Sequence, residues 1–124
     1  MTYLDTHVVI WLYAGQLVQL STTARGQIEQ DDLLISPMVV LELQYLREIG
    51  RLRTSSSKIV SALEKDVGLR ACDLPFSEVV EAALDQRWVR DPFDRLIVGQ
   101  AKANDAPLVT KDEKVLANYK RAIW

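Results

Sequence analysis

The feature that most constrains the fold is a regular alternation of short apolar runs with longer segments of helical periodicity. Apolar runs predict strands at 2–6, 33–35, 69–74 and 107–110, and a closing edge strand at 122–124. Helical spacing predicts helices at 7–14, 21–30, 37–50, 58–67, 77–88 and 92–103, and a last short helix that starts near 111–113. Strands separated by helices imply a mostly parallel sheet with helices on both faces.

The size of the chain predicts a single domain that spans residues 1–124. Its 124 residues are 48% hydrophobic and 26% charged, which is typical of a globular domain with one core. No apolar run approaches the ~18 residues of a membrane span, and Asp5 interrupts the N-terminus before a signal peptide could form. We therefore expect a cytoplasmic protein without a membrane partner. The single Cys72 is expected to be a buried small hydrophobe.

The segment 90–95 places two carboxylates at the start of an apolar helix. Asp91 is predicted as the N-cap, Pro92 as the first helical residue and Asp94 as the third. Asp94 could simply complement the helix dipole. However, helical spacing puts it on the stripe that must face the core, with Ile97, Val98 and Ala101. A carboxylate on such a stripe requires a compensating cation or dense hydrogen bonding.

Three further carboxylates are expected to meet Asp94. Asp5 and Asp112 follow the first and fourth predicted strands, and Glu42 lies at the edge of the apolar stripe of helix 37–50. Functional groups gather at the carboxyl ends of parallel strands. Each acid alone also fits an ordinary role as a turn or N-cap residue. Four converging acids, however, would repel one another unless they bound protons or a divalent cation.

The composition limits which cation and which chemistry this site can have. One histidine and one cysteine exclude a typical zinc site, whereas all-oxygen ligation suits Mg²⁺ or Mn²⁺. Such ions activate water and stabilise the charge of an attacked phosphate. His7 is either a general base or a structural residue, and Arg95 is expected on the flank of its helix. No nucleophile elbow, Walker loop or dinucleotide-binding glycine motif is present.

The charge distribution leaves a second question open. The formal net charge is -2, yet four cations follow one another around one predicted helix end and the loop after it. They are Arg47, Arg51, Arg53 and Lys58. This basic run is either a solvated face beside a helix C-terminus or a patch that contacts phosphate or an acidic partner segment.

Four segments of the chain resemble, in order, the acidic motifs of PIN-domain ribonucleases, and most closely those of VapC-type toxins of toxin-antitoxin modules. They span residues 3–7, 36–42, 91–97 and 108–112. The resemblance implies a PIN-like three-layer α/β/α sandwich with a mostly parallel central sheet. It also implies a Mg²⁺- or Mn²⁺-dependent endoribonuclease that forms a homodimer and is inhibited by a VapB-type antitoxin.

The resemblance also assigns residues. Asp5, Glu42, Asp94 and Asp112 match the acidic quartet of the family. Thr6 and Thr110 match its hydroxyl neighbours, and Asp91 is an additional candidate.

Three alternatives remain open on the sequence. A haloacid-dehalogenase-like phosphatase would need a second aspartate two residues after Asp5, where this chain has His7. A structure-specific DNA nuclease could use the same metal chemistry. A catalytically silent interaction module would need neither the four acids nor a metal.

Overall fold

Five parallel strands form the central sheet of the protein. The structure, a computed structural model, describes residues 1–124. The strands are β1 (Thr2–Leu4), β2 (Leu33–Ile35), β3 (Arg70–Ala71), β4 (Leu108–Val109) and β5 (Ala122–Ile123). Their order across the sheet is β3-β2-β1-β4-β5, and every neighbouring pair is parallel. The expected parallel sheet and its closing edge strand are therefore confirmed.

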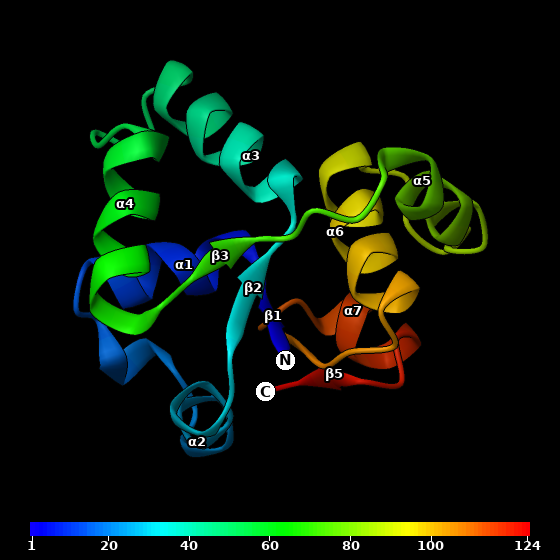
Figure 1. The fold of residues 1–124 in the computed structure, drawn as a ribbon, viewed down its shortest axis with the longest axis horizontal. Coiled ribbons are helices and arrows are strands. Elements are labelled where there is room, and N and C mark those ends of the chain that lie inside the picture. The colour runs from blue at the N-terminus through cyan, green and yellow to red at the C-terminus, as the bar shows by residue number, and fades with distance from the viewer.

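Helices cover both faces of this sheet. They are α1 (Thr6–Tyr13), α2 (Thr22–Gln30), α3 (Pro37–Glu48), α4 (Ser56–Val67), α5 (Phe76–Leu84), α6 (Pro92–Ala103) and α7 (Glu113–Asn118), with a short 3-10 helix, η1 (Leu17–Gln19). In Figure 1, α1 and α4 lie to the left of the strands, whereas α5, α6 and α7 lie to the right. This arrangement confirms the three-layer α/β/α sandwich. No helix in it combines the length and the apolar character that crossing a membrane requires.

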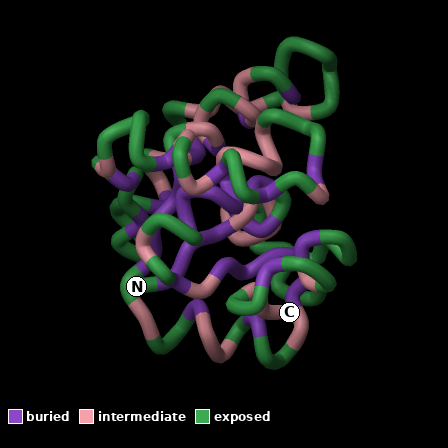
Figure 2. The backbone as a smooth tube through the Cα atoms, turned by 90° about the vertical axis from the view of Figure 1, so that its right-hand side faces the viewer, coloured by how far each residue is buried: buried purple, intermediate pink, exposed green.

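The core lies around the three central strands. Leu4, Ile35 and Leu108 are completely buried, one each from β1, β2 and β4. Figure 2 shows the buried segments in the interior of the molecule and the exposed loops around them. Because helices cover both faces, these strands are continuous apolar runs and do not alternate between apolar and polar residues.

Local capping explains where the helices of the site begin. Ser36 accepts a hydrogen bond from the backbone N–H of Met38 at 3.1 Å, and Pro37 opens α3. Asp91 accepts from the N–H of Asp94 at 3.1 Å, and Pro92 opens α6. Both starts agree with the sequence prediction, because an N-cap followed by proline at the first helical position requires only neighbouring residues.

Several element boundaries differ from the prediction. The third strand covers only 70–71 instead of 69–74, because β3 pairs with β2 alone and the chain then runs towards Pro75. The helix predicted at 77–88 spans 76–84, and the helix predicted at 58–67 starts earlier because Ser55 caps it. Helix α3 ends at Glu48, and Gly50 beyond it has a φ of +79°, which a continuing helix does not allow.

Helix α6, which carries Asp94, packs closely against α5. A Cβ atom added at Gly99 would lie 2.8 Å from the Cβ of Ala83 and 3.0 Å from the carbonyl oxygen of Val79. Only glycine therefore permits this approach of the two helices. The contact fixes the position of α6 relative to α5.

The strand order also sets the position of the site. Strand β1 has β2 on one side and β4 on the other, so the chain continues to both sides of β1. In open parallel sheets such a point leaves a crevice at the carboxyl ends of the strands. Asp5 directly follows β1, and Asp112 follows β4, so both acids lie at this crevice, as predicted.

Candidate metal centre

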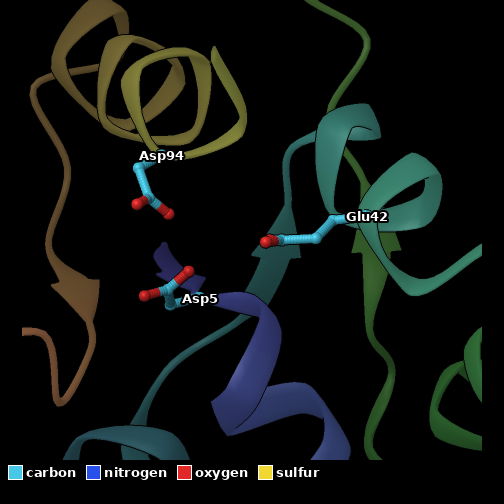
Figure 3. Close-up of side chains that lie close together, drawn as sticks. All are labelled: Asp5, Glu42 and Asp94. Carbon is cyan, nitrogen blue, oxygen red and sulfur yellow. The ribbon is translucent and has the colours of Figure 1, made fainter. Parts of the chain in front are cut away.

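Three carboxylates from three separate elements point towards one another at the carboxyl edge of the sheet (Figure 3). Asp5 follows β1, Glu42 lies in the second turn of α3, and Asp94 lies in the first turn of α6. One oxygen atom from each of them lies within 4.8 Å of the others. Oxygen ligands of an octahedral Mg²⁺ lie about 2.9 to 4.2 Å apart, since each is about 2.1 Å from the ion. Small side-chain rotations would therefore bring the three oxygens to this spacing.

Asp5 is held by hydrogen bonds on both carboxylate oxygens. Its Oδ1 accepts from the N–H of Thr6 at 2.8 Å, and its Oδ2 accepts from the hydroxyl of Thr110 at 2.6 Å. The Thr110 oxygen in turn accepts from the N–H of Asp112 at 3.1 Å. Burial raises the pKa of Asp5, and the two hydrogen bonds to its carboxylate oppose this rise. The carboxylate is thus oriented by β4 as well as by its own helix.

Glu42 is held by a second buried threonine. The hydroxyl of Thr6 donates to Oε1 of Glu42. Burial raises the pKa of Glu42, and the negative charge of Asp5 raises it further. Thr6 and Thr110 are both completely buried, so the hydroxyl neighbours that the family resemblance assigned do contact the two carboxylates.

Asp94 differs because no hydrogen bond reaches its carboxylate. Its backbone N–H donates to Oδ1 of Asp91, and its side-chain oxygens accept from no donor. Burial raises the pKa of Asp94 to about 7, and the charges of Asp5, Asp91, Glu42 and Asp112 contribute to the rise. A cation bound at this point would favour the ionised carboxylate. Asp94 is thus the member of the group whose charge is least compensated by the protein itself.

The three acids share a pocket of about 400 Å³, which Asp112 also lines. No ion pair compensates them, since the two ion pairs of the protein join Met1 to Asp31 and Arg121 to Asp105, outside this pocket. Oxygen donors that form no ion pair with a protein cation fit a hard divalent ion such as Mg²⁺ or Mn²⁺. Asp5, Glu42 and Asp94 are the residues that could hold it.

A comparison with known families agrees with this arrangement. The PIN domain family model matches residues 2–122. The chain belongs to the PIN domain family. This membership confirms the resemblance from the four acidic motifs, and it removes the haloacid-dehalogenase-like alternative.

One relative similar to this PIN domain is named a VapC ribonuclease, and several solved structures with a similar fold are named VapBC. The chain is 29% identical over 114 residues to Ribonuclease VapC22 of Mycobacterium tuberculosis (strain ATCC 25618 / H37Rv), which covers 90% of this chain and 87% of the relative. The fold is similar to VapBC2 from Rickettsia felis, solved with a promoter DNA fragment, with a TM-score of 0.62, 19% identity, and coverage of 100% and 98% of the two chains. It is also similar to DNA-bound VapBC from Salmonella typhimurium, with a TM-score of 0.63, 16% identity, and coverage of 98% and 93%.

The two other predicted acids of the PIN domain differ in whether they line the pocket. Asp112 lines the pocket, but its Oδ1 accepts from the backbone N–H groups of Lys114 at 2.8 Å and Val115 at 3.0 Å. Asp91 is exposed and caps α6. Both therefore have the capping role that the sequence also allowed. Asp112 is in addition a neighbour of the metal centre.

His7 and Arg95 lie on different sides of the site. His7 is exposed and lines the acidic pocket, and it forms no hydrogen bond with a carboxylate. Arg95 donates to the carbonyl oxygens of Ala83 at 2.8 Å and Leu84 at 3.1 Å, so it caps the C-terminal end of α5 and does not line the pocket. The structure therefore brings His7 to the carboxylates but not Arg95.

Besides the buried Val8, two residues that line the pocket were missed from the sequence. They are Trp11, four residues after His7 on α1, and Lys111, which directly precedes Asp112. Helical spacing assigns Trp11 to the apolar face of its helix. The only sequence signal for both residues was that they lie close to the acidic motifs along the chain. The exposed residues of the basic run, Arg47, Arg51, Arg53 and Lys58, do not line this pocket.

Proposed function

We propose that this PIN domain is a Mg²⁺- or Mn²⁺-dependent endoribonuclease. The observation that carries the proposal is the group of three carboxylates that share one pocket and form no ion pair with a protein cation. Asp5, Glu42 and Asp94 would hold the divalent ion, and Asp112 would add negative charge at the rim. When bound, such an ion supplies an activated water and stabilises the charge on the attacked phosphate.

The other residues of the chain would prepare this site for the reaction. Thr110 and Thr6 donate hydrogen bonds to Asp5 and Glu42 and so hold the two carboxylates in one orientation. Asp94 is free to rotate onto the ion, because it has no competing hydrogen-bond donor. The exposed imidazole of His7 would face the substrate at the rim of the pocket.

We further propose that the protein acts as the toxin of a toxin-antitoxin pair. The support is its similarity to Ribonuclease VapC22 and to chains of solved VapBC complexes. A VapB-type antitoxin would be its inhibitor, and a homodimer its assembly. The single domain over residues 1–124 and the cytoplasmic location stay predictions.

The proposal is tested by cleavage of a labelled single-stranded RNA. We expect cleavage with Mn²⁺, no cleavage with excess EDTA, and a large loss of rate in Asp94→Asn, which keeps the size of the side chain but removes its charge. Lys65→Gln, a change on the exposed surface of α4, is the matched control and should cleave at the wild-type rate.

Two outcomes would favour the alternatives. Preferential cleavage of a DNA of the same sequence would indicate the DNA nuclease. A protein that binds no Mn²⁺ in isothermal titration and cleaves neither substrate would be a silent interaction module.

A further inference from the structure

Three side chains form a cationic and aromatic cluster beside the acidic pocket: Trp11, Lys111 and Trp124. The Nζ atom of Lys111 lies 5.8 Å from the ring centroid of Trp11 and 5.9 Å from that of Trp124. The two indole rings are 6.0 Å apart and tilted by 56°. The ammonium group therefore lies over the faces of two aromatic rings at once.

The topology explains why these residues meet at the metal centre. Trp11 comes from α1, which Asp5 caps, and Lys111 lies between Thr110 and Asp112 in the loop after β4. Trp124 follows β5, which pairs in parallel with β4 through Val109 and Ile123. All three therefore lie at the carboxyl edge of the sheet, where the carboxylates also gather.

The position of Lys111 is unusual for a cation. It lines a pocket with four carboxylates, yet it forms an ion pair with none of them. Its cation–π contacts with Trp11 and Trp124 place the ammonium group near the acids without an ion pair to any of them. Its ammonium group can thus meet an anion that enters the pocket.

This combination of groups has the chemistry of a nucleotide-binding site. Indole faces stack on unpaired bases, and an ammonium group binds phosphate. Trp11 and Trp124 are only partly buried, and Lys111 is exposed, so all three remain accessible. A base within a duplex is stacked on its neighbours and cannot reach an indole face.

We propose that Trp11, Lys111 and Trp124 form a subsite that binds one nucleotide of single-stranded RNA next to the cleaved bond. A base stacks on an indole, and Lys111 contacts the phosphate adjacent to the one attacked at the carboxylates. This inference rests on the proposed ribonuclease function. It adds that these three residues position the strand at the metal centre.

Binding is measured separately from cleavage, in the Asp94→Asn background and with Mn²⁺ present. Trp88 contributes unwanted fluorescence, so Trp88→Phe is added, which leaves only the two indoles of the cluster to report. Single-stranded RNA hexamers should quench this fluorescence, and a duplex of the same sequence should not. The cluster variants are then compared by a labelled-RNA binding assay in the same background.

We expect Lys111→Gln to raise Kd about tenfold and to reduce the salt slope of binding by about one ion. Trp124→Ala should raise Kd by about fivefold or more, because it removes a stacking face. Trp124→Phe should restore most of the affinity. Lys65→Gln should leave both Kd and the salt slope unchanged.

The same changes in the active protein should raise KM more than they lower kcat, because contacts made equally in the ground and transition states act on KM. Melting curves establish that each variant is folded. If Trp124→Ala does not fold, Lys111→Gln and Trp124→Phe carry the test.

If the Lys111→Gln and Trp124→Ala variants bind RNA as tightly as the Lys65→Gln control, the subsite is overturned. The proposed function would still stand if the wild type cleaves RNA. Tighter binding of single-stranded DNA than of RNA would overturn the assignment to RNA. Conversely, a wild type that binds RNA through the cluster but does not cleave it would overturn the proposed function and leave the subsite standing.

Discussion

The first turns of α6 and α7 have nearly the same sequence pattern, but their acidic side chains have different roles. Asp91 caps α6 and Asp112 caps α7, and each helix has a second acid in its first turn, Asp94 and Glu113. In α7 the capping carboxylate accepts two backbone N–H groups and Glu113 is exposed. In α6 the carboxylate of the second acid, Asp94, lines the pocket and accepts no hydrogen bond. Burial raises its pKa to about 7.

The difference shows what separates a capping acid from a site acid. A carboxylate at a helix start is stabilised by the free N–H groups of the first turn, whatever lies opposite. Asp94 lies too far along its helix to cap it, and it faces Asp5 and Glu42. The helix start alone therefore does not decide the role of the acid.

The largest expected effect is on RNA cleavage. Asp94→Asn should lower the rate by about a hundredfold or more, because it removes a charge that would hold the cation. Asp112→Asn should lower it less, because asparagine keeps the cap and Asp112 lies outside the group of three carboxylates. Single-turnover assays of both variants check this. An equal or larger loss in Asp112→Asn would make Asp112 a full member of the site.

The next effect is stabilisation by metal. A ligand that binds only the folded state at a hundredfold excess over its Kd adds about 2.7 kcal/mol, and this corresponds to roughly 10 °C in Tm. We expect Mn²⁺ to raise the Tm of the wild type and of Asp112→Asn, but hardly that of Asp94→Asn. Differential scanning calorimetry with EDTA and then with Mn²⁺ measures it. Equal shifts in both variants would contradict the contrast between the two helix starts.

A smaller effect is the pH dependence of the metal-free protein. The pKa of Asp94 is about 7 in the folded state, against a reference value of 3.8, so the folded state holds the additional proton between these pH values. Stability should therefore be highest at the acidic end and should fall as the pH rises through about 7. Asp94→Asn should weaken this dependence and be at least as stable as the wild type at pH 7.5. Urea unfolding in EDTA across this range tests it, and a less stable Asp94→Asn would return Asp94 to a dipole-complementing role.

The smallest effect is the loss of the caps. Asp112→Ala should cost about 1 kcal/mol of unfolding free energy, because two backbone N–H groups lose their acceptor. Asp91→Ala should cost less in EDTA, because Asp91 accepts only one N–H, whereas the charges of both Asp91 and Asp112 repel Asp94. Urea titration measures both variants. A larger loss in Asp91→Ala would mean that the number of N–H groups accepted does not set the cost of losing a cap.

Much of the secondary structure was determined by the sequence alone. The Ser36-Pro37 and Asp91-Pro92 pairs predicted two helix starts, because capping needs only the first turn of the same helix. The apolar runs predicted the central strands, because burial on both faces leaves a continuous apolar pattern. The order of the acids along the chain and the oxygen-only donor set also predicted a metal centre, because the preference of an ion for its ligands depends on residue type.

Other properties were decided only by the tertiary structure. The strand order puts β4 beside β1, and the hydroxyl of Thr110 therefore donates to Asp5, although the two residues are 105 positions apart in the sequence. The side chain of Arg95 donates to carbonyl oxygens at the end of α5. The position of Arg95 on α6 alone could not predict this contact. The pairing of β5 with β4 brought Trp124 to Lys111. Helix starts and apolar runs depend on neighbours along the chain, whereas these contacts depend on which strands pair and how closely the helices pack on them.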